Sequence, residues 1–241
     1  MAGSVHGWTE WIPLIDRATP SPTDSAPTIR RIYKRLYAHY GPQDWWPADS
    51  PFEVVVGAVL TQNTAWSNVV KAIAALKKAR RLTVAGMRAL GDDQLADLIR
   101  PAGTYRVKAR RLRAVVDWLW AESGGDVRKA LSGDLETVRR RLLAVHGVGP
   151  ETADSILLYA GRHRSFVIDA YTRRVLRRHR LIDGDEPYES LREMMKGAIR
   201  LDLGVFGEYH ALLVQVAKEH CRVRARCEGC PLDSLAHDDA L

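Results

Sequence analysis

A Gly-x-Gly turn joins two apolar helical stretches in the sequence Val145-His146-Gly147-Val148-Gly149-Pro150-Glu151-Thr152-Ala153. Glycine permits positive φ and a close approach of the backbone, so the N–H groups at the start of the second helix can contact a phosphate. Asp169 follows Gly149 by twenty positions, where its carboxylate can face whatever the phosphate positions. Two simpler interpretations stay open: the turn also fits an ordinary αα-hairpin, and Asp169 also fits a helix N-cap.

Basic residues around the turn favour a contact with DNA phosphates over an ordinary hairpin. They are Arg139, Arg140, Arg141, Arg162 and Arg164. The whole chain is basic as well, with 36 Lys and Arg against 29 Asp and Glu, a formal net charge of +7. Such a charge favours anionic partners, of which nucleic acid is the commonest, although many basic proteins bind nothing anionic.

The composition predicts an ordinary globular protein, because 46% hydrophobic and 27% charged residues are typical of that class. A length of 241 residues allows one large domain or two small ones. No run approaches the roughly 18 apolar residues of a membrane span, and the N-terminal segment lacks the pattern of a signal peptide. We therefore expect no membrane association, a cytoplasmic location and no disulfide framework.

Helical signals recur along almost the whole chain, and alternating strand patterns are essentially absent, so the predicted class is all-α. The β-branched run after Phe52 would also suit a strand. The sequence Ser50-Pro51-Phe52-Glu53 decides for a buried helix, because it combines an N-cap, a proline at the first position and a capping-box glutamate. Residues 17–27 are rich in Pro, Ser and Thr and predict a flexible linker. We expect the other helices from 28 to 40 and near 65–79, 84–90, 93–99, 106–120, 135–144, 151–160, 170–180, 187–201 and 207–220.

Four features in this order resemble the helix-hairpin-helix (HhH-GPD) superfamily of DNA glycosylases, which includes endonuclease III. They are a Leu-Thr-Gln-Asn-Thr run at 60–64, the hairpin, Asp169 and a C-terminal cysteine loop. Trp45-Trp46-Pro47 and the run Gly-Val-Gly-x-Glu-Thr-Ala-Asp at 147–154 are most similar to the 3-methyladenine DNA glycosylases related to endonuclease III. The resemblance implies two helical subdomains that flank a DNA cleft.

The implied subdomains have expected boundaries. A helical barrel with the hairpin covers 46–160, and a second helical subdomain joins 28–45 to 165–241 and carries the cysteine loop. Residues 1–27 remain as an N-terminal tail and linker.

The resemblance implies that Asp169 is the catalytic residue, which stabilises an oxocarbenium-like sugar cation and orients or deprotonates the attacking water. Bifunctional members carry a lysine in the second hairpin helix that attacks the sugar. Glu151 stands at that position, and a carboxylate cannot form the imine, so the resemblance implies a monofunctional enzyme. The implied DNA-binding residues are Gln62, Asn63, Thr104, His146, Gly147, Val148, Gly149, Glu151, Thr152, Arg173 and Arg174.

Two of these residues are implied to fill the gap that a flipped base leaves. Gln62 matches the superfamily's wedge loop, and Thr104 stands where related enzymes often carry a leucine; a plain helix connection is the alternative for both. For the base pocket we expect Trp45 and Trp46, because a cationic methylated purine stacks well on electron-rich rings. A core role for at least one of the two tryptophans is the alternative.

The three cysteines of the chain lie close together near its end, at Cys221, Cys227 and Cys230. The C-x-x-C-P ending is typical of iron–sulfur loops, and many relatives of endonuclease III carry a four-cysteine [4Fe–4S] loop at this place. Ala236 stands where the fourth cysteine is expected, and His237 follows it as a candidate ligand, with Asp233 and Asp238 as the other candidates. Three interpretations stay open: a cluster with an unusual fourth ligand, zinc on three Cys and His237, or no metal.

The expected function is that of a DNA N-glycosylase in base excision repair. It would hydrolyse the N-glycosidic bond of a flipped, alkylated purine such as 3-methyladenine in double-stranded DNA, and it would act as a monomer. One alternative is an endonuclease III-like glycosylase and AP lyase for oxidised pyrimidines or mismatches. The other is a DNA-binding relative that has lost catalysis.

Overall fold

A computed structural model describes residues 22–199 and 203–238 of the chain. Within these ranges no strand occurs, and the predicted all-α class is confirmed. The elements are α1 (Pro22–Tyr40), α2 (Pro51–Leu60), α3 (Trp66–Lys78), α4 (Val84–Arg88), α5 (Asp92–Leu98), the 3-10 turn η1 (Arg100–Ala102), α6 (Tyr105–Ser123), α7 (Val127–Ala130), α8 (Leu135–Leu143), α9 (Pro150–Ser155), the π-helical turn η2 (Ile156–Ala160), α10 (Ala170–Arg178), α11 (Tyr188–Ala198) and α12 (Leu203–Glu219).

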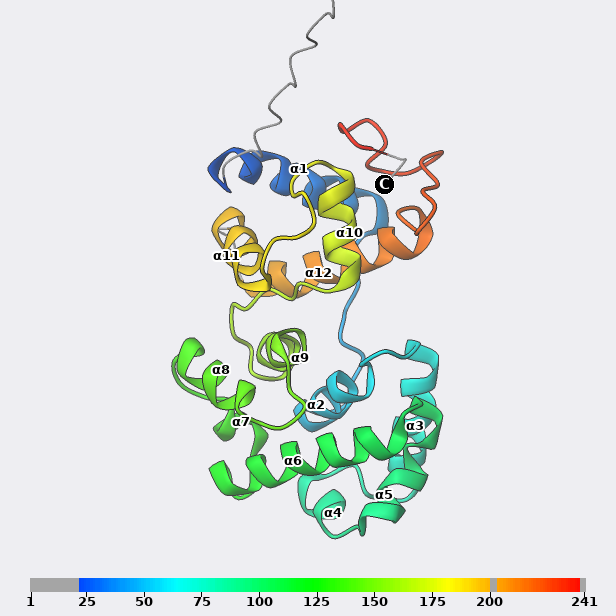
Figure 1. Ribbon diagram of the computed structural model, residues 1–241, viewed down its shortest axis with the longest axis vertical. Coiled ribbons are helices and arrows are strands. Elements are labelled where there is room, and N and C mark those ends of the chain that lie inside the picture. The colour runs from blue at the N-terminus through cyan, green and yellow to red at the C-terminus, as the bar shows by residue number, and fades with distance from the viewer. Residues whose placement is uncertain (1–21, 200–202, 239–241) are drawn as a thin grey trace, which may run out of the picture.

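The helices form two bodies, each around its own hydrophobic core (Figure 1). The hairpin body contains α2 to α9 with η2, and the terminal body contains α1, α10, α11, α12 and the C-terminal segment 220–238. Two connecting segments, 41–50 and 161–169, run between the bodies (Figure 1). The expected pair of helical subdomains is therefore present.

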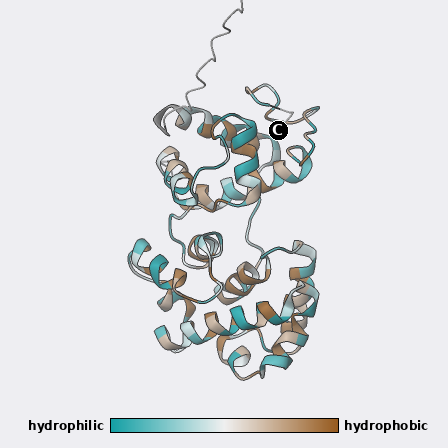
Figure 2. Cartoon of the chain, viewed as in Figure 1, coloured by the Kyte–Doolittle hydropathy of each residue, from teal (hydrophilic) through white to brown (hydrophobic). Residues whose placement is uncertain are grey.

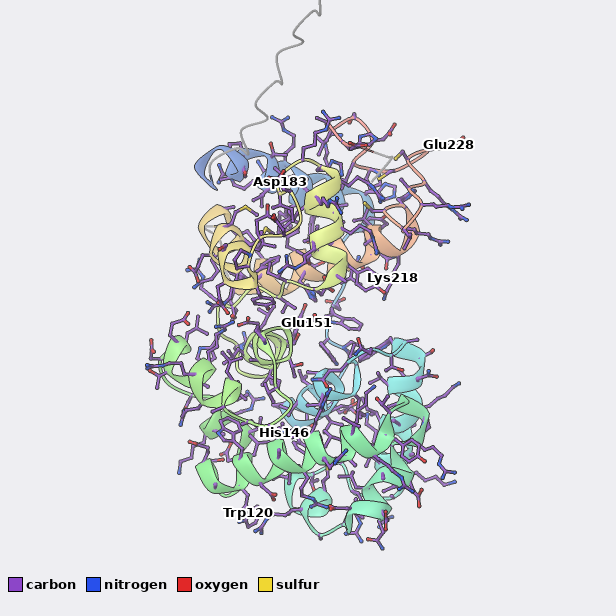
Figure 3. All side chains as sticks on the ribbon, in the orientation of Figure 1. Trp120, His146, Glu151, Asp183, Lys218 and Glu228 are labelled. Carbon is purple, nitrogen blue, oxygen red and sulfur yellow. The ribbon has the colours of Figure 1, made fainter. Side chains whose placement is uncertain are left out.

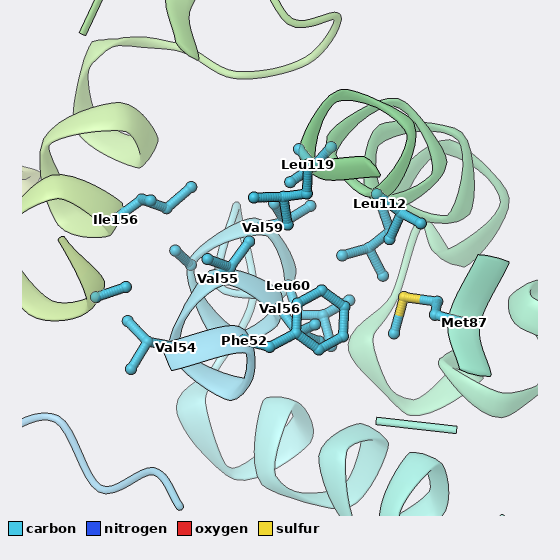
Figure 4. Close-up of a cluster of buried hydrophobic side chains, with 14 of the residues drawn as sticks. Phe52, Val54, Val55, Val56, Val59, Leu60, Met87, Leu112, Leu119 and Ile156 are labelled. Atoms are coloured by element: carbon cyan, nitrogen blue, oxygen red, sulfur yellow. The ribbon is translucent and has the colours of Figure 1, made fainter. Parts of the chain in front are cut away.

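Helix α2 forms the centre of the hairpin body. Every residue from Phe52 to Leu60 is buried, as expected for a helix that is apolar all round. The backbone N–H of Glu53 donates to Ser50 Oγ at 3.2 Å, which confirms the predicted N-cap. Figure 4 shows the α2 side chains meeting those of α4, α6 and η2. Burial of each large aliphatic side chain contributes about 1.5–3 kcal/mol, so the continuous run of buried residues in α2 contributes strongly to the stability of this body.

Helix α12 has the same central role in the terminal body, where it packs against α1 and α10. Phe206 and Tyr209 of α12 both contact the ring of Phe166, and the Tyr209 hydroxyl donates to the carbonyl of Ile29 in α1 at 2.8 Å. Hydrophobic and hydrophilic residues are interspersed along most of the helices (Figure 2). Among the described helices, none combines the length and the hydrophobicity that a membrane crossing needs.

The start of α1 differs from the prediction. The helix begins at Pro22, inside the stretch that we expected to be a flexible linker. Proline is favourable in the first turn of a helix, where its missing N–H leaves no hydrogen bond unmade, so a Pro-rich stretch can also start a helix. The rest of the expected linker and the N-terminal tail lie outside the described residues.

One of the arginines that we expected to contact DNA is instead buried. Arg139 is 6% exposed and holds Asp154 through two hydrogen bonds, from Nε at 2.9 Å and from Nη2 at 3.0 Å. Arg192 of α11 lies 3.4 Å from the same carboxylate, and Ser165 also donates to it. The expectation for Arg139 was wrong, because the guanidinium balances a fully buried charge that links the hairpin to the terminal body.

Candidate active site

A cavity of about 220 Å³ lies between the two bodies. Residues of the segment 41–50, the loop after α2 and helix α9 form one side of it, and the start of α10 with α12 forms the other. Several residues that the sequence analysis singled out separately meet in this lining: Trp45, Trp46, Gln62, Glu151, Thr152 and Asp169.

Asp169 caps α10 with one carboxylate oxygen and lies beside His210 with the other. Its Oδ1 accepts the backbone N–H of Thr172 at 2.7 Å and so caps α10. Its Oδ2 lies 3.4 Å from Nε2 of His210, and the side chain is only 13% exposed. Burial raises the pKa of Asp169, but the contact with His210 and the Thr172 N–H outweigh it, so the pKa is lowered. The cavity therefore contains a carboxylate that stays ionised at neutral pH.

His210 and Tyr159 are neighbours of Asp169 that the sequence analysis missed. His210 lies on α12, and its Nδ1 is 2.7 Å from the hydroxyl of Tyr159, which sits in the π-helical turn η2. The signal for His210 was a lone histidine in an otherwise apolar helical stretch. Nothing in the sequence around Tyr159 marks the π-helical turn, although such turns are frequent at functional sites.

Glu151 and Lys218 reach the cavity from opposite bodies (Figure 3). Glu151 lies in the first turn of α9, and burial together with the charge of Asp169 raises its pKa. Lys218 lies near the end of α12, with Nζ 5.9 Å from the centre of the Tyr171 ring. The sequence analysis did not identify Lys218, and it is the one lysine among the described lining residues.

Three indole rings form an aromatic wall of the cavity. The rings of Trp45 and Trp46 are 5.1 Å apart, and Trp66 contacts them at 4.9 and 5.3 Å. Trp46 also packs on Gly57 of α2 and on Tyr159, so it belongs to the core as well as to the lining. Trp66 was missed, although it lies only four positions after Gln62 and opens α3.

The loop after α2 and the hairpin share an open groove of about 690 Å³. Gln62 is tied to the hairpin: its Nε2 donates to the Gly147 carbonyl at 3.0 Å and to Thr152 Oγ1 at 2.9 Å, and its Oε1 accepts from Arg111. Gly147 adopts φ +82°, with the Arg111 side chain lying where a Cβ would be. The glycine thus allows the turn to pack closely on α6.

The other hairpin residues differ in their exposure. His146 is exposed, Val148 is buried in the core, and Gly149 is the N-cap of α9 with open space beside it. Asn63 and Thr104 are exposed in left-handed conformations, with φ +52° and +40°. Of the residues expected to contact DNA, Val148 therefore presents its side chain to the protein interior and offers only its backbone.

Arg173 and Arg174 of α10 hold neighbouring segments of the terminal body. Arg173 Nη1 donates to the carbonyl of Glu186 at 2.9 Å, and Arg174 Nε donates to that of Cys221 at 2.6 Å. Both side chains are half-buried. Arg174 links the helix that carries Asp169 to the cysteine loop.

The cysteine loop surrounds a small cavity of about 20 Å³. Cys221 is buried and accepts a hydrogen bond from Arg178 Nη1 at 3.1 Å. Burial and the neighbouring thiols raise the pKa of Cys230. The ligand atoms of Cys227, Asp233 and His237 lie within 4.8 Å of one another. The loop therefore gathers thiol, imidazole and carboxylate groups around one point.

Comparisons with known proteins agree with this arrangement. Residues 56–200 match the profile of the HhH-GPD superfamily base excision DNA repair proteins. A protein of Methanocaldococcus jannaschii with the provisional description of a DNA repair glycosylase is 45% identical over 206 residues, which cover 85% of this chain and 93% of that protein. Endonuclease III of Thermotoga maritima is 28% identical over 202 residues, which cover 83% of this chain and 86% of that enzyme.

Solved structures show the same fold. The 3-methyladenine DNA glycosylase of H. pylori, bound to 1,N6-ethenoadenine, is similar with a TM-score of 0.70 at 25% identity, over 81% of this chain and 97% of that one. A non-covalent complex of endonuclease III with DNA has a TM-score of 0.74 at 22% identity, over 88% of this chain and 94% of that one. The chain belongs to the HhH-GPD superfamily of base excision DNA repair proteins, together with endonuclease III.

Proposed function

We propose that the protein is a monofunctional DNA glycosylase that removes a cationic alkylated purine, with 3-methyladenine as the leading substrate, from double-stranded DNA. The observation that carries this proposal is one cavity that holds an ionised carboxylate, Asp169, beside three indole rings. Electron-rich rings attract cations, and a carboxylate stabilises developing positive charge. The similarity to a 3-methyladenine glycosylase supports the same substrate class.

The proposed reaction breaks the C1′–N bond to the base and forms a C1′–O bond to water. The sugar passes through an oxocarbenium-like state, which the negative charge of Asp169 stabilises. The same carboxylate takes the proton of the attacking water. A positively charged purine keeps the bonding electron pair and leaves as a neutral base, so its departure needs no acid. The products are the free base and an abasic site.

Hydrolysis without strand cleavage follows from the residue at position 151. A glutamate cannot form the imine on which lyase chemistry depends, and Lys108 is engaged elsewhere, with Nζ donating to two backbone carbonyls. Lys218 favours a second candidate function, that of an endonuclease III-like glycosylase and lyase, because its amine reaches the same cavity. It is exposed on the opposite body, where it also suits a contact with a DNA phosphate.

For DNA binding we propose the groove that joins the wedge loop to the hairpin. The backbone of the hairpin turn and the start of α9 suit a phosphate, and Gln62, Asn63 and Thr104 are the candidates to enter the gap left by the base. Gln62 would first have to leave its bonds to the hairpin, whereas Asn63 and Thr104 are exposed already. One chain carries all these parts, so we propose that it acts as a monomer.

For the cysteine loop we propose a structural [4Fe–4S] cluster held by Cys221, Cys227, Cys230 and His237. Three thiols and an imidazole line one small cavity, which is a donor set that suits such a cluster. The Arg178 guanidinium at the Cys221 sulfur suits a ligand that carries negative charge. Bound there, the cluster would cross-link the loop that follows α12.

Zinc is the alternative occupant of this loop. The compact group of Cys227, Asp233 and His237 favours it, because zinc binds thiolate, carboxylate and imidazole in one tetrahedral set. Elemental analysis of the purified protein separates the cases. Iron with acid-labile sulfide supports the cluster, and stoichiometric zinc supports a mononuclear site instead. The absence of both iron and zinc contradicts both proposals.

The function is tested with end-labelled duplexes that each carry one damaged base, and with alkylated DNA assayed for free bases. Each duplex is analysed with and without alkali. We expect free 3-methyladenine, and cleaved strands only after alkali. Strand cleavage without alkali and a borohydride-trapped complex that disappears in Lys218→Ala would instead establish the lyase function. If no damaged base gives a product, the protein is a DNA-binding protein that has lost catalysis.

A further inference from the structure

His210 occupies a position that no structural requirement of α12 explains. It is 6% exposed in a helix whose other buried residues are apolar or aromatic. Its Nε2 lies 3.4 Å from Asp169 Oδ2 and has no hydrogen bond of good geometry within the described part of the chain. A buried imidazole nitrogen that faces a carboxylate rather than a carbonyl or solvent indicates an electrostatic role.

The neighbours of the ring determine where its protons are. A carboxylate oxygen only accepts, so Nε2 must carry a hydrogen to make its contact with Asp169 favourable. The Tyr159 hydroxyl lies 2.7 Å from Nδ1 and 3.2 Å from the carbonyl of Gly207. Because a carbonyl only accepts, the hydroxyl hydrogen suits Gly207, and Nδ1 then donates to the tyrosine oxygen. All three contacts are made at once when both ring nitrogens carry a hydrogen, that is, by the imidazolium.

We propose that His210 is a positioning residue that holds Asp169 ionised and oriented in the cavity, and that Tyr159 keeps the imidazole in place. The inference rests on the proposed function, in which Asp169 is the catalytic carboxylate. A positive charge beside a carboxylate stabilises its ionised form. His210 thereby offsets both the burial of Asp169 and the repulsion from Glu151, the other carboxylate that lines the cavity.

The side chains around His210 come from three elements and from the segment that precedes α10. Asp169 at the start of α10 and Glu151 on α9 are the acidic groups that interact with it, and Tyr159 of η2 is the neutral partner of the other nitrogen. The ring of Phe166 lies edge-on to the imidazole, with the ring centroids 6.5 Å apart.

The test measures the ionisation of Asp169 directly, by carboxyl ¹³C NMR titration of protein labelled at aspartate, with Asp169→Asn to assign the signal. His210→Phe removes the charge and the donors but keeps an aromatic ring. We expect the midpoint of Asp169 to rise by about 1–3 pH units, which is the range for loss of an adjacent opposite charge. His210→Gln keeps a donor without the charge and should give a smaller rise. An unchanged midpoint in His210→Phe would overturn the proposal.

Two further measurements separate this proposal from its alternatives. If His210→Phe does not fold, Tyr159→Phe replaces it; we expect a smaller rise of the same sign, and no rise overturns the proposal. Single-turnover base release should lose activity at acidic pH in His210→Phe, with affinity for damaged DNA unchanged. The titration needs no turnover, so a midpoint that shifts in a protein that releases no base would refute the proposed function and leave the interaction between His210 and Asp169 intact.

Discussion

Replacement of Asp154 by asparagine should destabilise the protein strongly although it changes only one atom. The carboxylate is fully buried and balances the guanidinium of Arg139, which donates to both of its oxygens. The buried Arg192 lies 3.4 Å from it. Asparagine removes the negative charge, and its NH2 group faces N–H donors where an acceptor is needed.

The magnitude follows from the burial of these charges. Breaking a buried ion pair by removing one partner costs about 3–5 kcal/mol, because the remaining charge is left uncompensated. Glu189 and Glu136 still contact the two arginines from the surface, so we expect the lower half of that range, about 3–4 kcal/mol. For a protein of this size, each kcal/mol lowers Tm by about 2–4 °C, so the expected decrease is about 6–16 °C.

The assay is urea unfolding followed by circular dichroism, together with thermal unfolding. Asp97→Asn is the matched control, because Asp97 forms an ion pair with Arg100 at 3.6 Å but both side chains are about 70% exposed. Exposed pairs contribute about 0–1 kcal/mol, so the control should unfold like the original protein. A decrease for Asp154→Asn that is no larger than that of the control would refute the reasoning that this network links the two bodies.

Three other predictions concern the site. Gly147→Ala places a Cβ against the Arg111 side chain at φ +82°, so affinity for duplex DNA measured by fluorescence anisotropy should fall about tenfold, whereas Gly197→Ala on α11, with open space beside it, should change it little. Partial enclosure in the cavity and the charge of Asp169 raise the pKa of Glu151, and a carboxyl with a raised pKa destabilises the fold above its unfolded pKa. Glu151→Gln should therefore raise the free energy of unfolding and Tm at pH 7 and not below about pH 4; because more than about a third of the residue is exposed and solvent screens its charge, the gain should be less than about 1 kcal/mol. A gain that is equal at both pH values would contradict this sign. Trp45→Ala should slow single-turnover release of cationic purines about 2–30-fold, because it removes a cation–π contribution of about 0.5–2 kcal/mol. The release of a neutral damaged base should slow by a smaller factor. If both rates fall by the same factor, Trp45 does not recognise the charge of the base.

Local signals explain why much of the fold was predictable from the sequence. The N-cap at Ser50 and the glycine turn at 147–149 act within a few residues, and both lie where they were expected; the capping-box glutamate, Glu53, accepts from the N–H of Asp49 instead of that of Ser50. The short helix α7 was missed, because a single turn with Asp126 as its N-cap has no hydrophobic periodicity to detect.

The site was only partly predictable, because it is assembled from segments far apart in the chain. Asp169 and Glu151 stood out through a motif. His210, Tyr159 and Lys218 gain their significance only when α12 packs beside η2 and the start of α10. Arg139 shows the opposite effect: it lies in a run of arginines that favours DNA contacts, and the partner that buries it is fifteen positions away on the next helix.

The central claim, that Asp169 carries out base excision, is tested most directly by Asp169→Asn. Asparagine is as good an N-cap as aspartate, so α10 should keep its start and only the charge is lost. Release of 3-methyladenine from alkylated DNA is measured in single turnover beside the affinity for the same DNA. We predict that the original protein releases the base and that the variant binds equally well but releases it at least about a hundredfold more slowly. Release at an undiminished rate by the variant would contradict the assignment.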